Sequence, residues 1–288
     1  DVCSSDLFYP SSMSPLVTVV IPCYNGAKVV GRCLSALERQ TYAPLEVLLI
    51  DDASTDGTAD AVAKYPFVKL LRNETNRGVS YARNRGVEEA RGKYIHFLDV
   101  DDEVSSNFYE EMVRYAEETG AEVTACSFVY QHVPDKSQIF RTPRVYTGTM
   151  DKLRVTYVCK IGVVWRYLFR TDFIRRHEDL RFPVGRLVED LPFAVRALFY
   201  ANKVATAPRA EYLYRYEADS LTESDDPEVR RAFAEGYDLA EEDVKSFLAA
   251  HGVHRRPGRD SHLISYFLHK VSNRLRGGQT DLTERLMR

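Results

Sequence analysis

Four apolar segments in the first hundred residues alternate with helical patterns, and this alternation restricts the chain to a small set of folds. The segments are residues 16–21, 46–50, 67–71 and 94–98. Between them, apolar residues recur every three or four positions, as in helices that cover a sheet. Repeated strand–helix units predict an α/β fold with a mostly parallel sheet and right-handed crossovers.

The fourth segment ends in a dense group of carboxylates. Residues 94–102 read YIHFLDVDD, so Asp99, Asp101 and Asp102 follow an apolar strand. Because side chains alternate between the two faces of a strand, we expect Asp99 and Asp101 to point the same way. Crowded carboxylates favour a cation between them, and their hard oxygen atoms suit Mg²⁺ or Mn²⁺ carrying a substrate phosphate. The alternative is a solvated acidic turn, since Asp is common where strands end.

Polar residues also follow the first two strands. Pro22, Tyr24 and Asn25 come after the first, and Asp51 and Asp52 open the segment DDASTDG after the second. Ligands of parallel α/β sheets bind at the carboxyl ends of the strands, where these residues would meet the YIHFLDVDD carboxylates. DDASTDG also precedes an expected helix, so helix capping is the alternative explanation. The chain has no GxGxxG and no GxxxxGK[ST], so the ordinary dinucleotide-binding and P-loop folds are unsupported.

The composition excludes several classes of protein. A chain of 288 residues can bury a large core, and its net charge of −3 argues against nucleic acid as an obligatory partner. The five cysteines are odd in number and show no CxxC spacing, which fits a reducing, cytoplasmic setting. No apolar stretch approaches the ~18 residues of a membrane span. Residues 1–13 show no periodicity and no signal-peptide pattern, and we expect them to form a tail outside the fold.

The second half of the chain differs in composition. Residues 144–226 are rich in aromatic residues and arginine, including WRYLFR at 165–170. Aromatic faces beside charged side chains are typical of carbohydrate sites, but the same side chains build cores, and a core position is the better explanation for Trp165 taken alone. From Pro227 onward the pattern is helical. We therefore expect boundaries near residues 105 and 226, with a helical extension at 227–288.

A basic amphipathic pattern occupies residues 254–276. Six Arg or Lys residues there accompany a stripe of apolar residues. Such a helix can lie on the inner face of an anionic membrane, which would suit a lipid-linked acceptor. The favoured alternative is that the stripe packs on the main domain and the basic face is solvated.

The order of these motifs resembles that of the bacterial family-2 glycosyltransferases. VVIPCYN at 19–25 is similar to their (I/V)IPxYN, and DVDD at 99–102 is similar to the DxDD that contains their DxD signature. DDASTD at 51–56 is similar to their DDGSTD, with Ala53 replacing a glycine, and NRGVSYARNRG at 76–86 is similar to their NxGxxxARNxG. Later in the chain, WRYLFR at 165–170 is similar to their W-x-x-L-(Y/F)-(R/K), and Glu189-Asp190 to their ED pair. Residues 215–220 are similar to the basic residue and the serine that follow their late YxY. The resemblance covers residues 16–222. It implies the GT-A fold, a Rossmann-like, mostly parallel sheet flanked by helices, here with a helical C-terminal extension.

The resemblance also implies a function and its residues. The expected enzyme is an inverting, metal-dependent transferase that moves a sugar from a nucleotide sugar, with a UDP-sugar as first choice, to a glycan or lipid-linked glycan in cell-surface polysaccharide biosynthesis. Residues 14–105 would bind the donor, and 106–226 would bind the acceptor and supply Asp190 as general base. The donor residues implied are Pro22, Tyr24, Asn25, Asp51, Asp52, Gly78, Arg83, Asp99 and Val100. The metal, Mn²⁺ or Mg²⁺, is assigned to Asp101 and Asp99, and the acceptor to Trp165, Glu189, Arg215 and Ser220.

Several alternatives stay open at this point. Arg83 is expected to pair with a carboxylate rather than to face the donor diphosphate, and His96 is expected to pack in the core. Glu189 and Asp190 also suit the first turn of a helix, where acidic residues are favoured. A sugar nucleotidyltransferase would likewise need paired carboxylates and a metal, although the chain lacks a Gly-rich phosphate loop. A non-catalytic, glycan-binding relative is the remaining alternative.

Overall fold

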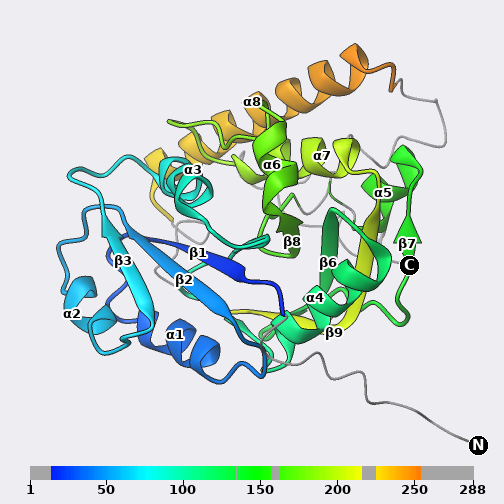
Figure 1. Ribbon diagram of the computed structural model, residues 1–288. Helices are drawn as coiled ribbons and strands as arrows, with labels where there is room; N and C mark the ends of the chain where they lie inside the picture. The colour runs from blue at the N-terminus through cyan, green and yellow to red at the C-terminus, as the bar shows by residue number, and fades with distance from the viewer. Residues whose placement is uncertain are drawn as a thin grey trace, which may run out of the picture.

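The computed structural model describes residues 14–133, 135, 137–156, 158, 162–215 and 225–253. The predicted tail at 1–13, the basic segment at 254–276 and Ser220 lie outside the described residues. Within the described ranges, one sheet of nine strands has the order β3-β2-β1-β4-β8-β6-β9-β5, with β7 paired to β9 (Figure 1).

The first half of the sheet is parallel, as the alternation predicts. The parallel strands are β3 (Val68–Arg72), β2 (Leu45–Asp51), β1 (Val17–Cys23) and β4 (Tyr94–Phe97). Every residue of β1 and β4 is buried, because helices cover both faces of these central strands. Because the four strands are parallel, their carboxyl ends lie at one edge of the sheet.

The second half of the sheet is mixed. The antiparallel strand β8 (Tyr167–Arg170) joins β4 to β6 (Val123–Tyr130). Strand β6 then pairs in parallel with β9 (Val204–Tyr214), and the short strands β5 (Glu103–Val104) and β7 (Val145–Tyr146) run antiparallel to β9. Both predicted halves thus contribute strands to the same sheet.

The helices cover the two faces of the sheet (Figure 1). One face packs on α1 (Val30–Glu38), α2 (Thr58–Val62) and α4 (Phe108–Thr119). The other face packs on α3 (Val79–Glu89), α5 (Thr149–Val155), α6 (Thr171–Arg176), α7 (Asp190–Tyr200) and α8 (Pro227–Ala250). Each face of the sheet thus has its own hydrophobic core. Successive residues of β1 point to opposite cores: Val20 packs on the α3 side, and Val19 and Ile21 pack on the α1 side.

Two contacts place the helices that carry site residues. A Cβ atom at Gly86 of α3 would overlap Val20 of β1, so a glycine allows α3 to lie directly against the sheet. On α7, the ring of Phe193 stacks on Phe182 with centroids 4.1 Å apart. Helix α8 covers α7 through Val244 and Phe247, which confirms the expected helix after Pro227. Within the described residues, no helix is long and apolar enough to cross a membrane.

Candidate active site

The turn after β1 carries an exposed tyrosine on a fixed main chain. The Tyr24 side chain is 52% exposed. Its neighbour Asn25 has a positive φ of 52°, donates its main-chain N–H to Ser54 Oγ at 2.8 Å and accepts the Thr55 N–H at 2.9 Å through Oδ1. These bonds fasten the turn after β1 to the turn after β2. The Tyr24 ring is therefore presented at the carboxyl edge of the sheet, whereas Pro22 lies buried within β1.

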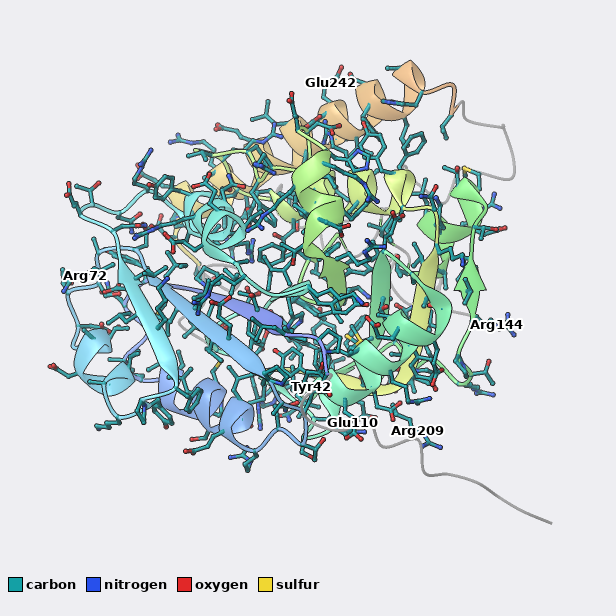
Figure 2. The ribbon with its side chains drawn as sticks, viewed as in Figure 1. Tyr42, Arg72, Glu110, Arg144, Arg209 and Glu242 are labelled. Carbon is teal, nitrogen blue, oxygen red and sulfur yellow. The ribbon has the colours of Figure 1, made fainter. Side chains whose placement is uncertain are left out.

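Asp51 is engaged inside the turn after β2. Its side chain is fully buried, and Oδ1 accepts the main-chain N–H of Ser54 at 2.9 Å. Arg72, labelled on β3 in Figure 2, donates to Ser54 O at 2.7 Å and lies 3.5 Å from Asp51 Oδ2. These contacts hold the turn itself and do not cap α2, whose N-cap residue is Gly57 with no side-chain cap. In this position Asp51 shapes the turn and is shielded from a ligand.

Asp52 fixes the loop that leads into α3. It is 3% exposed and accepts Asn73 Nδ2 at 2.6 Å, together with the main-chain N–H groups of Arg77 and Gly78 at 3.0 and 2.7 Å. Gly78 has a φ of 85°, which favours glycine. Direct recognition of a nucleobase by Asp52 would have to displace or share these donors.

The carboxylates after β4 belong to a turn. Strand β4 ends at Phe97, and the Asp102 N–H donates to Asp99 O at 3.1 Å. The predicted strand alternation of Asp99 and Asp101 is therefore wrong, because the pleat has ended before them. Asp102 is 1% exposed and accepts Tyr212 Oη and the Arg215 N–H, each at 2.7 Å. Burial raises the pKa of Asp102, and the neighbouring charges of Asp101 and Asp99 raise it further. Asp102 thus anchors the end of β9.

Asp101 lies in the same turn as Asp99 and Asp102. Its side chain is half-buried, and its main-chain carbonyl accepts Arg32 Nη2 at 2.7 Å, which fixes the turn. Asp99 accepts Arg83 Nη2 through Oδ1. Among the described residues, no three His, Cys, Asp or Glu side chains gather into a metal cluster. Mg²⁺ is usually held by only one or two protein carboxylates together with substrate phosphates, so Asp101 fits such a site.

A buried arginine joins the turn after β4 to the start of α7. Arg83 is 3% exposed, and its Nη2 donates to Asp99 Oδ1 at 2.9 Å. Its Nη1 donates to Glu189 Oε1 at 2.6 Å and to Asp190 Oδ1 at 2.5 Å. The predicted pairing of Arg83 with carboxylates is confirmed, because both Nη atoms donate to protein carboxylates. The assignment of Arg83 to the donor diphosphate stays a prediction.

The charges of this cluster and its burial shift the pKa of Asp190. Burial raises the pKa of the Asp190 carboxyl, Arg83 opposes that rise, and the charges of Glu189 and Asp99 add to it. The pKa of Asp190 is raised overall, because burial and two neighbouring carboxylates outweigh one guanidinium. The other oxygen of Asp190, Oδ2, accepts the Val164 N–H at 3.2 Å. A carboxylate with a raised pKa is a better proton acceptor near neutral pH than an ordinary Asp.

The expected acceptor residues are only partly gathered at this site. Glu189 joins the Arg83 cluster, but Trp165 is 2% exposed and stacks on Tyr212 with centroids 4.1 Å apart. The assignment of Trp165 to the acceptor is therefore corrected to core packing. Arg215 donates Nε to Glu103 Oε1 at 2.9 Å, at the end of β9.

The remaining two residues are His96, in β4, and Val100, in the turn after it. His96 is buried and contacts Tyr109 Oη at 3.0 Å and Trp165 O at 2.7 Å, and burial lowers its pKa to about 4, as expected of a core histidine. Val100 is half-buried and lies beside Gly26 of the turn after β1. Sequence reasoning missed Val164 and Asn73, which carry no recognisable pattern.

Comparisons with known proteins agree with this architecture. The model of the family "Glycosyl transferase family 2" matches residues 18–176, more than half of the chain. EpsJ of Bacillus subtilis, described as an uncharacterized glycosyltransferase, is 31% identical over 226 residues, which are 73% of this chain and 64% of EpsJ. The chain therefore spans slightly less than two thirds of this relative.

Solved structures share the fold at lower identity. Staphylococcus aureus TarS 1-349 in complex with UDP superposes with a TM-score of 0.63 and 23% identity, covering 85% of this chain and 74% of that one. The mannosyltransferase PcManGT from Pyrobaculum calidifontis, in complex with GDP-Man and Mn²⁺, gives a TM-score of 0.59 and 18% identity, covering 92% and 71%. These likenesses confirm the expected GT-A fold. From the match of the family model and the similarity to EpsJ, the chain belongs to glycosyl transferase family 2.

Proposed function

We propose that the protein is an inverting, metal-dependent glycosyltransferase that uses a nucleotide sugar, with a UDP-sugar as first choice. One observation carries the proposal: Arg83 bonds Asp99 at the carboxyl end of β4 and Asp190 at the start of α7. A general base thus lies one side chain away from the edge at which ligands of parallel sheets bind. Family membership supports the reaction class.

The donor nucleotide is proposed to bind at the turns after β1, β2 and β4. The exposed Tyr24 ring offers a face on which a nucleobase can stack. Asn25, Asp51, Asp52, Gly78 and Val100 are proposed to shape this pocket through the turns that they hold, and Pro22 through its place in β1. The complexes of TarS with UDP and UDP-GlcNAc support a uridine donor, while PcManGT with GDP-Man keeps guanosine as the second choice.

Asp101 is the proposed protein ligand of Mn²⁺ or Mg²⁺, and PcManGT with Mn²⁺ supports a metal in this fold. Such a cation, when bound, would stabilise the negative charge that develops on the departing diphosphate. Asp99 is proposed to border this position while its Oδ1 remains bound to Arg83.

Asp190 is the proposed general base. It accepts the proton of the acceptor hydroxyl as that oxygen attacks the anomeric carbon. The new glycosidic bond forms on the face opposite the leaving group, while the bond from the anomeric carbon to the donor phosphate oxygen breaks. The electron pair of that bond leaves with the nucleoside diphosphate, and the anomeric configuration is inverted.

The acceptor is proposed to be a glycan or a lipid-linked glycan of a cell-surface polysaccharide. Glu189 and Arg215 are the described residues proposed to border the acceptor position. The proposed acceptor role of Ser220 and the membrane contact through 254–276 concern residues outside the described ranges.

Donor turnover tests this proposal without knowledge of the acceptor, because water can replace it slowly. Purified protein is incubated with UDP-glucose, UDP-GlcNAc or GDP-mannose, with Mn²⁺ or with EDTA, and release of UDP or GDP is measured. We expect release with one of these donors, dependent on Mn²⁺ and lost in Asp101→Asn. Release of pyrophosphate from a sugar phosphate and UTP would instead identify a nucleotidyltransferase, and nucleotide binding with no turnover of any donor would identify a non-catalytic relative.

A further inference from the structure

Arg83 occupies the centre of the site, but its hydrogen-bonding groups face the protein. Its Nη atoms donate to three carboxylates, which come from two places far apart in the chain, the turn after β4 and the start of α7. A planar guanidinium suits this task because its donors have a fixed geometry and can engage several carboxylates at once.

The surroundings of Arg83 leave it little freedom. Its guanidinium lies 5.4 Å from the ring centroid of Phe182. The next residue along α3, Asn84, holds Phe182 from both sides, donating Nδ2 to Phe182 O at 2.8 Å and accepting the Phe182 N–H at 2.9 Å. Phe182 in turn stacks on Phe193 of α7. The helix that supplies Arg83 therefore also fixes the aromatic ring beneath it, and that ring packs on the helix that begins with Asp190.

The two oxygens of Asp190 are not equivalent. Oδ1 is 2.5 Å from Arg83 Nη1, in a hydrogen bond between two charged groups, whereas Oδ2 accepts the uncharged main-chain N–H of Val164 at the longer distance of 3.2 Å. The short bond within an ion pair is held more strongly than the longer bond from an uncharged donor. The weaker contact is the one more readily exchanged for an acceptor hydroxyl, so Oδ2 is the oxygen suited to take up a proton.

We propose that Arg83 is a positioning residue that ties the base to the donor end of the sheet: it binds Asp190 Oδ1 and Asp99 Oδ1 with one guanidinium and leaves Asp190 Oδ2 to face the acceptor hydroxyl. This inference rests on the proposed transferase function. It assigns to Arg83 a role in orienting the base, in place of direct contact with the donor.

The test separates donor binding from turnover in Arg83→Lys. The Kd for UDP with Mn²⁺ is measured by calorimetry, and kcat for release of nucleoside diphosphate is measured with the best donor of the wild-type protein. A lysine ammonium keeps the charge but cannot bridge carboxylates from both places in the same geometry. We expect kcat to fall 10- to 1,000-fold while the Kd for UDP stays within threefold of wild type.

Two further variants keep the experiment decisive. Arg196→Lys is the matched control, because Arg196 is another arginine paired with a carboxylate, Asp243, and lies on α7 outside the Arg83 cluster. Its kcat should stay within twofold of wild type. The double variant Arg83→Gln with Glu189→Gln removes one positive and one negative charge together, so the net charge of the buried cluster is retained if Arg83→Lys fails to fold. It should bind UDP normally and turn over slowly.

Three results would overturn the inference. Wild-type kcat in Arg83→Lys would show that the orientation of Asp190 does not depend on Arg83. A rise in the Kd for UDP that matches the fall in kcat would show that Arg83 contacts the donor. A wild-type protein that turns over no donor would overturn the proposed function itself and the role of Arg83 with it, and the wild-type control distinguishes this result from the other two.

Discussion

Replacing Asp190 with Asn should separate catalysis from stability. The change removes the proposed base and keeps the shape of the side chain. General-base catalysis typically contributes 10²- to 10⁴-fold, so kcat should fall by that factor, or about 3–5 kcal/mol in the barrier. Stability should change little. Three carboxylates share one guanidinium in the Arg83 cluster, and removal of one negative charge relieves their repulsion. The loss of the 3.2 Å bond from the Val164 N–H offsets this gain by about 1 kcal/mol.

The pH dependence of stability gives an independent check. Because burial raises the folded-state pKa of Asp190 above its unfolded value near ~3.9, the folded protein binds more protons between these two values. This contribution to stability is fully present below the unfolded pKa and is lost as pH rises through the folded pKa. In urea denaturation, the stability of the wild type relative to Asp190→Asn should therefore rise as pH falls from 7 to about 4.

Asp243 provides a matched control, because its pKa is shifted in the opposite direction to that of Asp190. Burial tends to raise the pKa of Asp243, but hydrogen bonds from Arg196 and Arg186 outweigh it and lower the pKa. Its contribution is present above the unfolded pKa and is lost as pH falls through the folded pKa. Asp243→Asn should lose stability at neutral pH and keep wild-type kcat. The reasoning about Asp190 is refuted if Asp190→Asn keeps wild-type turnover, or if it loses more than about 3 kcal/mol of stability, the loss expected when a well-compensated buried pair is broken.

Three further substitutions test other parts of the account. Tyr24→Ala should weaken UDP binding by ~1–3 kcal/mol, the range for base stacking, and leave the thermal midpoint unchanged because the ring is 52% exposed; equal UDP affinity in calorimetry would remove Tyr24 from the site. Gly86→Ala should destabilise the protein by ~1–3 kcal/mol in urea, since the added Cβ would overlap Val20, and an unchanged midpoint would mean that α3 can shift freely. Lys152→Met should cost ~1–3 kcal/mol with kcat unchanged, because Lys152 Nζ donates to Phe199 O and Ala201 O at the end of α7; a selective loss of kcat would contradict a purely structural role.

Local sequence patterns were sufficient to predict the first half of the fold. Strands β1 to β4 and the helices between them follow from apolar periodicity, because each pattern is complete within about ten residues. The antiparallel insertion of β8 between β4 and β6 could not be predicted in this way. Strand pairing is a long-range property, and a four-residue apolar segment does not specify its neighbours.

The candidate site shows the same limit. Resemblance brought Asp99, Glu189 and Asp190 into one prediction, but their common partner is recognisable only in space, since Arg83 lies 16, 106 and 107 residues from them in the chain. Composition suggested a sugar contact for Trp165, whereas packing against Tyr212 buries it. The same residue types occur in motifs whether they hold a turn or contact a ligand. Their burial in the folded protein distinguishes the two roles.

A crystal structure of the protein with UDP and Mn²⁺ would test the proposed donor site and the role of Arg83 together. We expect electron density for the uracil against the Tyr24 ring, Mn²⁺ bound to an Asp101 oxygen and the diphosphate, and Arg83 still bonded to Asp99 and Asp190. UDP bound away from the turns after β1, β2 and β4, or a diphosphate bonded to Arg83 in place of these carboxylates, would contradict it.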